Sequence, residues 1–236
     1  MVYNFFTSVF FLFFSITATT PKHTESAGTL TATNTNNVVS EARSVYNSIK
    51  LHSGSMPEFN VFEKAVKGFK HLKEQGKIKK DIITLIDFSL SSNAKRLWII
   101  DMTTKTVLYN TLVAHGKNSG DEFATAFSNA SSSNKSSLGF YATGEIYRGK
   151  HGESLRLDGL ENGINSNARS RAVVMHAADY VTENFIKTHK RLGRSQGCPA
   201  LPPAINKEVI NLIKGQSCLF IYHPSQNYVA ASKLLS

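Results

Sequence analysis

Hydrophobic residues recur every three or four positions in the region that begins at residue 38. Over residues 57–76 the repeat consists of Phe59, Phe62, Val66, Phe69 and Leu72. This spacing places the apolar side chains on one face of an α-helix, and Pro57 and Gly76 suit its beginning and end. Apolar residues in the preceding stretch, 39–49, also fall on one helical face. We therefore predict a pair of helices over residues 38–78.

From residue 82 onward the pattern changes to short β-rich runs. Branched and aromatic residues in such runs, separated by polar turn residues, predict strands. The expected strands cover residues 82–88, 96–101, 106–115, 138–147, 154–160, 171–177 and 218–222. Residues 205–215 are expected to form a short helix between the last two. The predicted fold class is mainly β, with short helices and an N-terminal helical segment.

The first 37 residues show neither pattern. An uncharged apolar run extends from Phe5 to about Ala18, and the first charged residue is Lys22. The run is typical of a secretory signal and is short for a membrane span, which needs about 20 apolar residues. We expect a cleaved signal peptide or a short anchor over residues 1–20, followed by a flexible tether over residues 21–37. Either way the globular part would be exported, and an uncleaved segment would engage the membrane.

The chain has 236 residues and a formal net charge of +10, which favours anionic partners. Its Lys and Arg residues are scattered and form no basic stripe interleaved with aromatic residues, so nucleic acid is not an expected partner. The sequence contains no motif with metal-ligand spacing, no P-loop and no dinucleotide-binding fingerprint. Neither a metal nor a cofactor is expected.

Two cysteines are too few for a disulfide framework. Cys218 lies in an apolar, strand-like run and is expected to be buried, whereas Cys198 lies in the polar stretch RSQGCPAL. Gly197 permits a tight turn that exposes the sulfur and points backbone N–H groups at one place, as an oxyanion hole requires. We expect both cysteines to be reduced and only Cys198 to be a nucleophile, activated by a neighbouring base or cation.

Histidine is the side chain best suited to act as that base near neutral pH. His176 follows the apolar run AVVM and should emerge at the tip of a strand, a rigid support for a catalytic group. His115 also follows an apolar run and could line the same cleft. His176 is therefore the preferred partner of Cys198, and His115 is a candidate for substrate contact.

Five segments in fixed order carry a resemblance to a known family. They are HGKNSG (115–120), SSLGFY (136–141), GKHGESLRLDGLENGIN (149–165), VVMHAADY (173–180) and GRSQGCPAL (193–201). Together they resemble the murein L,D-transpeptidase catalytic domain, the YkuD-type fold, over about residues 80–225. The resemblance implies a β-sandwich-like catalytic domain, which we place at residues 79–236.

The resemblance also implies roles for individual residues. The expected catalytic group consists of Cys198 as nucleophile, His176 as base, and Gly197, Ser195 and Gln196 in the turn whose N–H groups form the oxyanion hole. Substrate carboxylates are expected to bind Arg194 or Arg171, with Arg191 as another candidate. Ala177, Gln196 and Ala200 depart from the family's common residues, which bears on substrate contacts more than on the nucleophile.

The function implied is that of an exported cysteine acyltransferase in the bacterial periplasm or cell envelope. A thiolate–imidazolium pair would attack a peptidoglycan stem peptide and form a thioester on Cys198. An amine acceptor then gives a crosslink, and water gives L,D-carboxypeptidase activity. Two alternatives stay open: a non-catalytic wall-binding module with the same fold, and a sortase-like cysteine acyltransferase, which would need an Arg on a neighbouring strand as oxyanion partner.

Overall fold

The computed structural model describes residues 1–2, 39–52 and 54–236. The predicted signal peptide or anchor and the tether therefore lie outside the described residues, apart from the first two. Within the described part, no helix has the length and apolar character needed to cross a membrane. The strands are β1 (Lys50–Leu51), β2 (Ile82–Asp87), β3 (Leu97–Asp101), β4 (Thr106–Thr111), β5 (Gly139–Gly149), β6 (Gly152–Gly159), β7 (Val174–Ala177), β8 (Ala200–Leu201) and β9 (Cys218–Tyr222). The helices are residues 39–48, α2 (Phe59–Glu74), α3 (Glu183–His189), α4 (Pro203–Ile213) and α5 (Gln226–Ala231).

The strands form one mixed sheet in the order β1-β4-β3-β2-β9-β5-β6-β7-β8. Three neighbouring pairs are parallel: β1 with β4, β2 with β9, and β7 with β8. The predicted strand runs each contain a strand, and the predicted helix at 205–215 corresponds to α4. The mainly β fold class with an N-terminal helical segment is thus confirmed. The division between residues 78 and 79 stays a prediction.

The sheet curls back on itself. After β4 the chain makes an antiparallel bridge from Ala114 to Ala200 and a parallel bridge from Gly116 to Ser195. Ala200 belongs to β8, the strand at one edge of the sheet, whereas β4 lies next to the opposite edge. The continuation of β4 therefore approaches the far edge of the sheet and supports the segment that contains Cys198.

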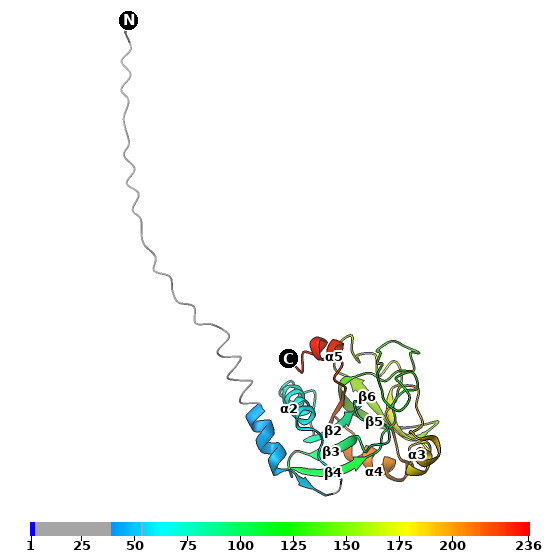
Figure 1. The fold of residues 1–236 in the computed structure, drawn as a ribbon. Helices are drawn as coiled ribbons and strands as arrows, with labels where there is room; N and C mark the ends of the chain where they lie inside the picture. Colours follow the sequence, from blue (N-terminus) through cyan, green and yellow to red (C-terminus); the bar gives the residue numbers. More distant parts are fainter. Residues whose placement is uncertain (3–38, 53) are drawn as a thin grey trace.

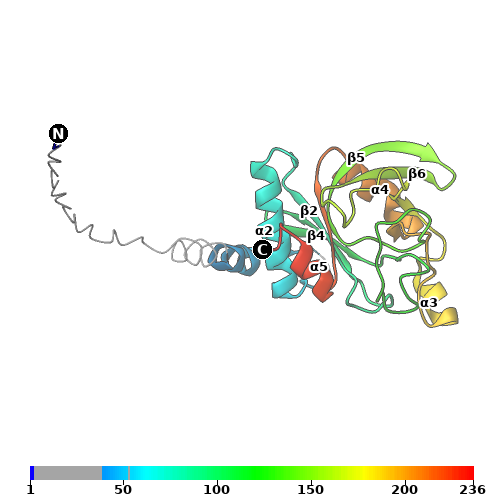
Figure 2. The same cartoon turned by 90° about the horizontal axis from the view of Figure 1, so that it is seen from above.

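The helical segment covers the half of the sheet away from this closure. Helix α2 packs on β2 and β9, and a Cβ atom at Gly68 would lie 2.1 Å from Cζ of Phe140, so glycine lets the helix approach that ring. Helix 39–48 packs on α2 through Tyr46, whose ring meets Phe59 edge-on with centroids 5.3 Å apart. Figures 1 and 2 show α5 beside α2, and α3 at the opposite end of the molecule. The apolar face predicted for residues 57–76 is therefore buried against the sheet.

Candidate active site

The parallel pairing of β7 and β8 places the two candidate catalytic residues in one cleft. His176 on β7 is paired with Ala200 on β8, two residues after Cys198. Both His176 and Cys198 line a cleft with a volume of about 880 Å³. The strand register thus joins two residues that lie on opposite sides of the α3 segment in the sequence.

Cys198 sits half-buried at the end of a tight turn. Its Sγ accepts a hydrogen bond from the Val174 N–H at 3.4 Å and lies 3.8 Å from the carbonyl oxygen of Ala172. Both contacts come from the chain that leads into β7. The sulfur is therefore held against the strand that also carries His176. Cys198 and Cys218 are both free cysteines, and Cys218 is buried, as expected.

Ser195 and Gly197 shape this turn. Gly197 has a φ of 123°, and a Cβ atom there would lie 2.8 Å from the carbonyl oxygen of Lys135. Ser195 Oγ accepts the Gly197 N–H at 3.0 Å and donates to the Cys198 carbonyl at 2.6 Å. Glycine is required here because other residues rarely adopt this φ and would meet the neighbouring loop. The Ser195 hydroxyl therefore braces the turn.

The contact between Gly197 and Ser195 bears on the predicted oxyanion hole. The Gly197 N–H donates to Ser195 Oγ and is therefore engaged within the turn. Across the described residues, the N–H groups of Gln196 and Cys198 have no hydrogen-bond partner. These two groups are the donors that the turn offers to a substrate carbonyl.

Ser136 ties the turn to the neighbouring segment. Its Oγ accepts the Gly116 N–H at 3.0 Å and donates to the Gly197 carbonyl at 3.1 Å. Ser136 as a whole residue is 1% exposed. A single buried side chain therefore links the closure of the sheet at Gly116 to the cysteine turn.

His176 is oriented by its own backbone neighbour and by a second histidine. Its Nδ1 lies 2.8 Å from the Ala177 carbonyl, so Nδ1 carries the hydrogen and Nε2 is left as the acceptor. The ring of His151 stacks on that of His176, with centroids 4.3 Å apart and planes inclined by 19°. The imidazole is 3% exposed and lines the cleft. This tautomer is the one that a general base requires.

The electrostatics of the cleft favour a neutral pair at rest. Burial raises the pKa of the Cys198 thiol, and the Val174 N–H, Arg171 and Lys150 only partly oppose it. Burial also lowers the pKa of His176, as do His151 and Lys150, against the effect of its contact with Ala177. These directions favour a thiol beside a neutral imidazole instead of the predicted thiolate–imidazolium pair. Proton transfer would then accompany attack by the sulfur.

Arg171 lines the cleft, but its guanidinium holds the polar loop 128–137. It donates to the carbonyl oxygens of Ser128 and Lys135, each at 2.8 Å, and to the hydroxyls of Ser137 at 2.5 Å and Ser133 at 3.1 Å. The loop is thereby fastened beside the cysteine turn. Arg171 therefore supplies positive charge near the sulfur while its hydrogen-bonding capacity is used within the chain.

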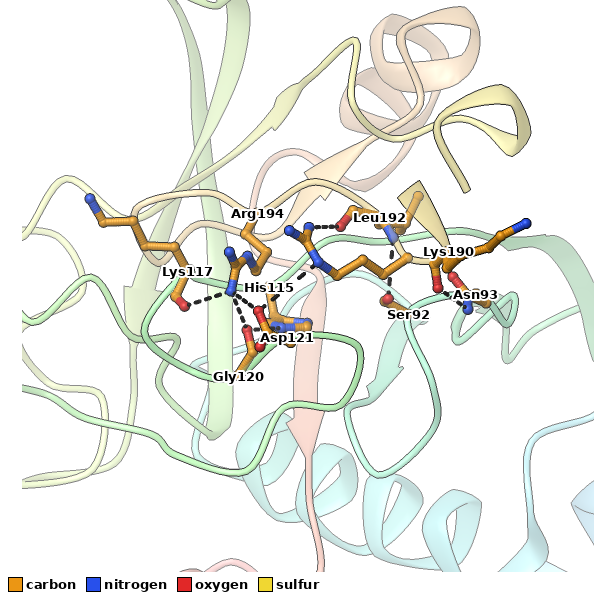
Figure 3. A network of polar contacts seen from close by, with 10 residues as sticks. Ser92, Asn93, His115, Lys117, Gly120, Asp121, Lys190, Leu192 and Arg194 are labelled. Carbon is orange, nitrogen blue, oxygen red and sulfur yellow. Dashed lines mark hydrogen bonds and ion pairs between the residues drawn. The ribbon is translucent and has the colours of Figure 1, made fainter. Parts of the chain in front are cut away.

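Arg194 is similarly engaged (Figure 3). It forms an ion pair with Asp121 and donates to the carbonyl oxygens of Gly120 at 3.1 Å and Lys117 at 3.4 Å. Arg191 lies 4.0 Å from the same carboxylate. Arg194 does line the cleft, as predicted for a substrate-binding residue. Its contacts, however, stabilise the loop 115–121.

The structure places His115, a predicted substrate contact, in the interior and not among the residues that line the cleft. His115 is 1% exposed, and its Nδ1 lies 2.7 Å from a guanidinium nitrogen of the buried Arg96. Its Nε2 lies 3.2 Å from the Gly120 carbonyl (Figure 3). Since arginine can only donate, Nδ1 accepts and Nε2 donates. Burial, and then the charge of Arg96, lower the pKa of His115 to about 4. Both ring nitrogens are thus used inside the protein.

Three residues that the sequence patterns did not indicate also line the cleft. The turn between β5 and β6 contributes Lys150 and His151, and the segment after β7 contributes Tyr180. Burial, followed by the nearby Cys198, raises the pKa of Tyr180 to about 12. The paired glycines around the β5–β6 turn were a signal for a hairpin, but nothing local in the sequence showed that it reaches His176. Among the described residues, no group of three His, Cys, Asp or Glu side chains could hold a metal.

Comparison with known proteins identifies the family. The L,D-transpeptidase catalytic domain model matches residues 54–222, more than half of the chain. Similar solved structures include an L,D-transpeptidase from Mycobacterium smegmatis, with 11% identity, TM-score 0.38 and coverage of 61% of this chain and 59% of that one. An L,D-transpeptidase from Stackebrandtia nassauensis has 12% identity, TM-score 0.36 and coverage of 80% and 90%. A search of curated proteins finds no match. On the strength of the family match, the chain belongs to the L,D-transpeptidase catalytic-domain family.

Proposed function

We propose that this protein is an L,D-transpeptidase that acts on peptidoglycan stem peptides through a thioester on Cys198. The main support is the register of β7 and β8, which brings the Cys198 turn and His176 to one cleft. The neutral tautomer of His176, with Nε2 free to accept a proton, supports its role as general base. The cleft is also large enough to admit a peptide.

In the first step a tetrapeptide stem is the acyl donor. The Cys198 thiol passes its proton to Nε2 of His176 while the sulfur attacks the carbonyl carbon of the third residue. The N–H groups of Gln196 and Cys198 stabilise the oxyanion. The C–N bond to the terminal D-Ala then breaks, and the leaving amine takes the proton from His176. The products are free D-Ala and a thioester on Cys198.

In the second step an amine of a neighbouring stem attacks the thioester. His176 accepts a proton from that amine, the C–S bond breaks, and the returning proton restores the Cys198 thiol. The new amide bond is a crosslink between two stems. When water is the acceptor, the same steps release a tripeptide, and the enzyme acts as an L,D-carboxypeptidase.

An exported location in the periplasm or cell envelope is part of the proposal. The apolar run within residues 1–20 supports export by its composition, and the net charge of +10 suits a polymer with free carboxylates. A membrane anchor in place of a cleaved signal would retain the enzyme beside the cell wall. Comparing the mass of the mature N-terminus from expressing cells with that of the full chain distinguishes the two.

The experiment that tests the proposed function is intact-mass measurement after incubation with a tetrapeptide stem or with a carbapenem. We expect a covalent adduct on wild-type protein that maps to Cys198 and is absent from Cys198→Ala. Cys218→Ala is the matched control, because Cys218 is buried in β9 and should leave the adduct unchanged. No adduct on folded wild-type protein with a free Cys198 thiol would favour the wall-binding module instead.

A further inference from the structure

One cation in the cleft has no partner within the described part of the chain. Arg171 and Arg194 are engaged by loop 128–137 and by Asp121, as described above. Lys150 also lines the cleft, yet its ammonium forms no ion pair or hydrogen bond with the described residues. Exposed lysines are common on protein surfaces. A role for Lys150 in substrate binding therefore has to be argued from its position relative to His176 and Cys198.

Lys150 is held at the tip of the longest hairpin of the sheet. β5 and β6 are joined by the two-residue turn Lys150–His151, with Gly149 and Gly152 paired at its base. His151 stacks on His176, which fixes the tip of the hairpin against the catalytic imidazole. The charge of Lys150 also acts on both reacting groups, since it lowers the pKa of Cys198 and of His176. Lys150 is therefore an exposed cation at the edge of the cleft that contains both candidate catalytic residues.

The chemistry of the first step locates the leaving residue. His176 must return its proton to the leaving nitrogen, so that nitrogen has to lie within hydrogen-bond reach of Nε2. In an α-amino acid the carboxylate carbon is two bonds from that nitrogen. The terminal carboxylate of the donor must then fall close to His176, on the side of the cleft that the hairpin tip occupies.

We propose that the tip of the β5–β6 hairpin is the subsite for the carboxylate of the leaving residue, with Lys150 as its cation and His151 as the residue that positions the tip. This assignment rests on the proposed function, because it presumes a donor peptide with a free terminal carboxylate. In this assignment Lys150 binds the terminal carboxylate of the donor, so Arg171 and Arg194 can remain bound to their loops. It also predicts a preference between two donors that differ only at their terminus.

The test compares a tetrapeptide stem that ends in a free carboxylate with the same peptide ending in an amide. Acylation of Cys198 is followed by intact mass, and the ratio of the two rates is the readout. We expect wild-type protein to prefer the free acid by about tenfold, the size typical of a charge-assisted hydrogen bond. Lys150→Ala should abolish the preference, and Lys150→Arg should retain it.

Three further variants distinguish this subsite from general effects of charge and fold. Lys187→Ala removes the same charge from the exposed face of α3 and should keep the wild-type ratio. His151→Ala should reduce the ratio, whereas His151→Phe should preserve it, because a phenyl ring can still stack on His176. A rescue by phenylalanine would assign His151 a positioning role that does not need its proton.

The outcomes distinguish the two proposals. If wild-type and Lys150→Ala proteins are both acylated and show the same preference between the two peptides, the carboxylate subsite is overturned while the proposed function stands. If neither peptide nor a carbapenem acylates folded wild-type protein, the proposed function fails and the subsite fails with it. A lost preference in Lys150→Ala with retained acylation by the amide peptide supports the subsite.

Discussion

His176 and His115 have similar sequence contexts but different hydrogen-bond partners. Each histidine follows an apolar run, His176 within β7 and His115 after the end of β4, and each is at most 3% exposed. His176 has one ring nitrogen bound by the Ala177 carbonyl and the other available in the cleft. His115 has both nitrogens bound, one to Arg96 and one to Gly120. Burial alone therefore does not distinguish these two histidines, whereas the number of ring nitrogens bound within the protein does.

The largest effect should come from removing the base. We expect His176→Gln to lower the rate of Cys198 acylation by roughly 10²–10⁴-fold, the usual contribution of a general base. Because glutamine keeps polar contacts near Ala177, the thermal unfolding midpoint should stay close to that of wild type. Acylation rates measured by intact mass against a stem peptide provide the readout.

The pH dependence of that rate gives a second check on His176. Since burial lowers its pKa, the imidazole is neutral at a lower pH than an exposed histidine, whose ordinary value is 6.5. The acidic limb of kcat/KM should therefore have its midpoint below 6.5. A midpoint above that value would contradict the neutral resting pair.

His115 should matter to stability and not to chemistry. Its pKa is about 4 in the folded chain against an ordinary value of 6.5. The unfolded chain binds the proton more tightly, so the free energy of unfolding is highest above pH 6.5 and falls as the pH drops toward 4. Linkage puts the loss at about 3 kcal/mol at most.

His115→Gln, which cannot titrate but can accept from Arg96 and donate to Gly120, should flatten this part of the stability curve. Urea unfolding of both proteins between pH 7 and pH 4 measures the difference. Equal slopes for the variant and for wild type would show that His115 is not the group responsible. The acylation rate of the folded variant at neutral pH should remain much closer to wild type than that of His176→Gln.

The smallest expected effect lies at Ser136, which connects the two regions. Its hydroxyl bridges the Gly116 N–H and the Gly197 carbonyl. Ser136→Ala should reduce the free energy of unfolding by about 1 kcal/mol, the net worth of such hydrogen bonds. Acylation should fall modestly because the cysteine turn loses a brace. An unchanged stability in urea unfolding would argue that water replaces the hydroxyl.

The sequence predicted much of this fold because its hydrophobic periods are local. The α2 face and the strand runs follow from side-chain spacing, and so does the position of His176 at a strand end. The tight turn at Cys198 could be predicted because Gly197, which precedes the cysteine, permits a positive φ. What could not be predicted depended on distant partners: Arg96 binds His115, Ser136 braces the Gly197 carbonyl, and burial in the cleft raises the pKa of Cys198. Spacing along the chain carries no information about those contacts.

The position of β9 has a consequence for biosynthesis. This strand, Cys218–Tyr222, follows the other strands of the described part of the chain, yet it lies between β2 and β5 in the middle of the sheet. Until it is in place, the half of the sheet built by β2–β4 has no hydrogen-bonded connection through the centre to the half that carries His176. The two halves of the sheet can therefore pair through its centre only after residue 222 has emerged, so a chain truncated before β9 exposes the facing edges of β2 and β5.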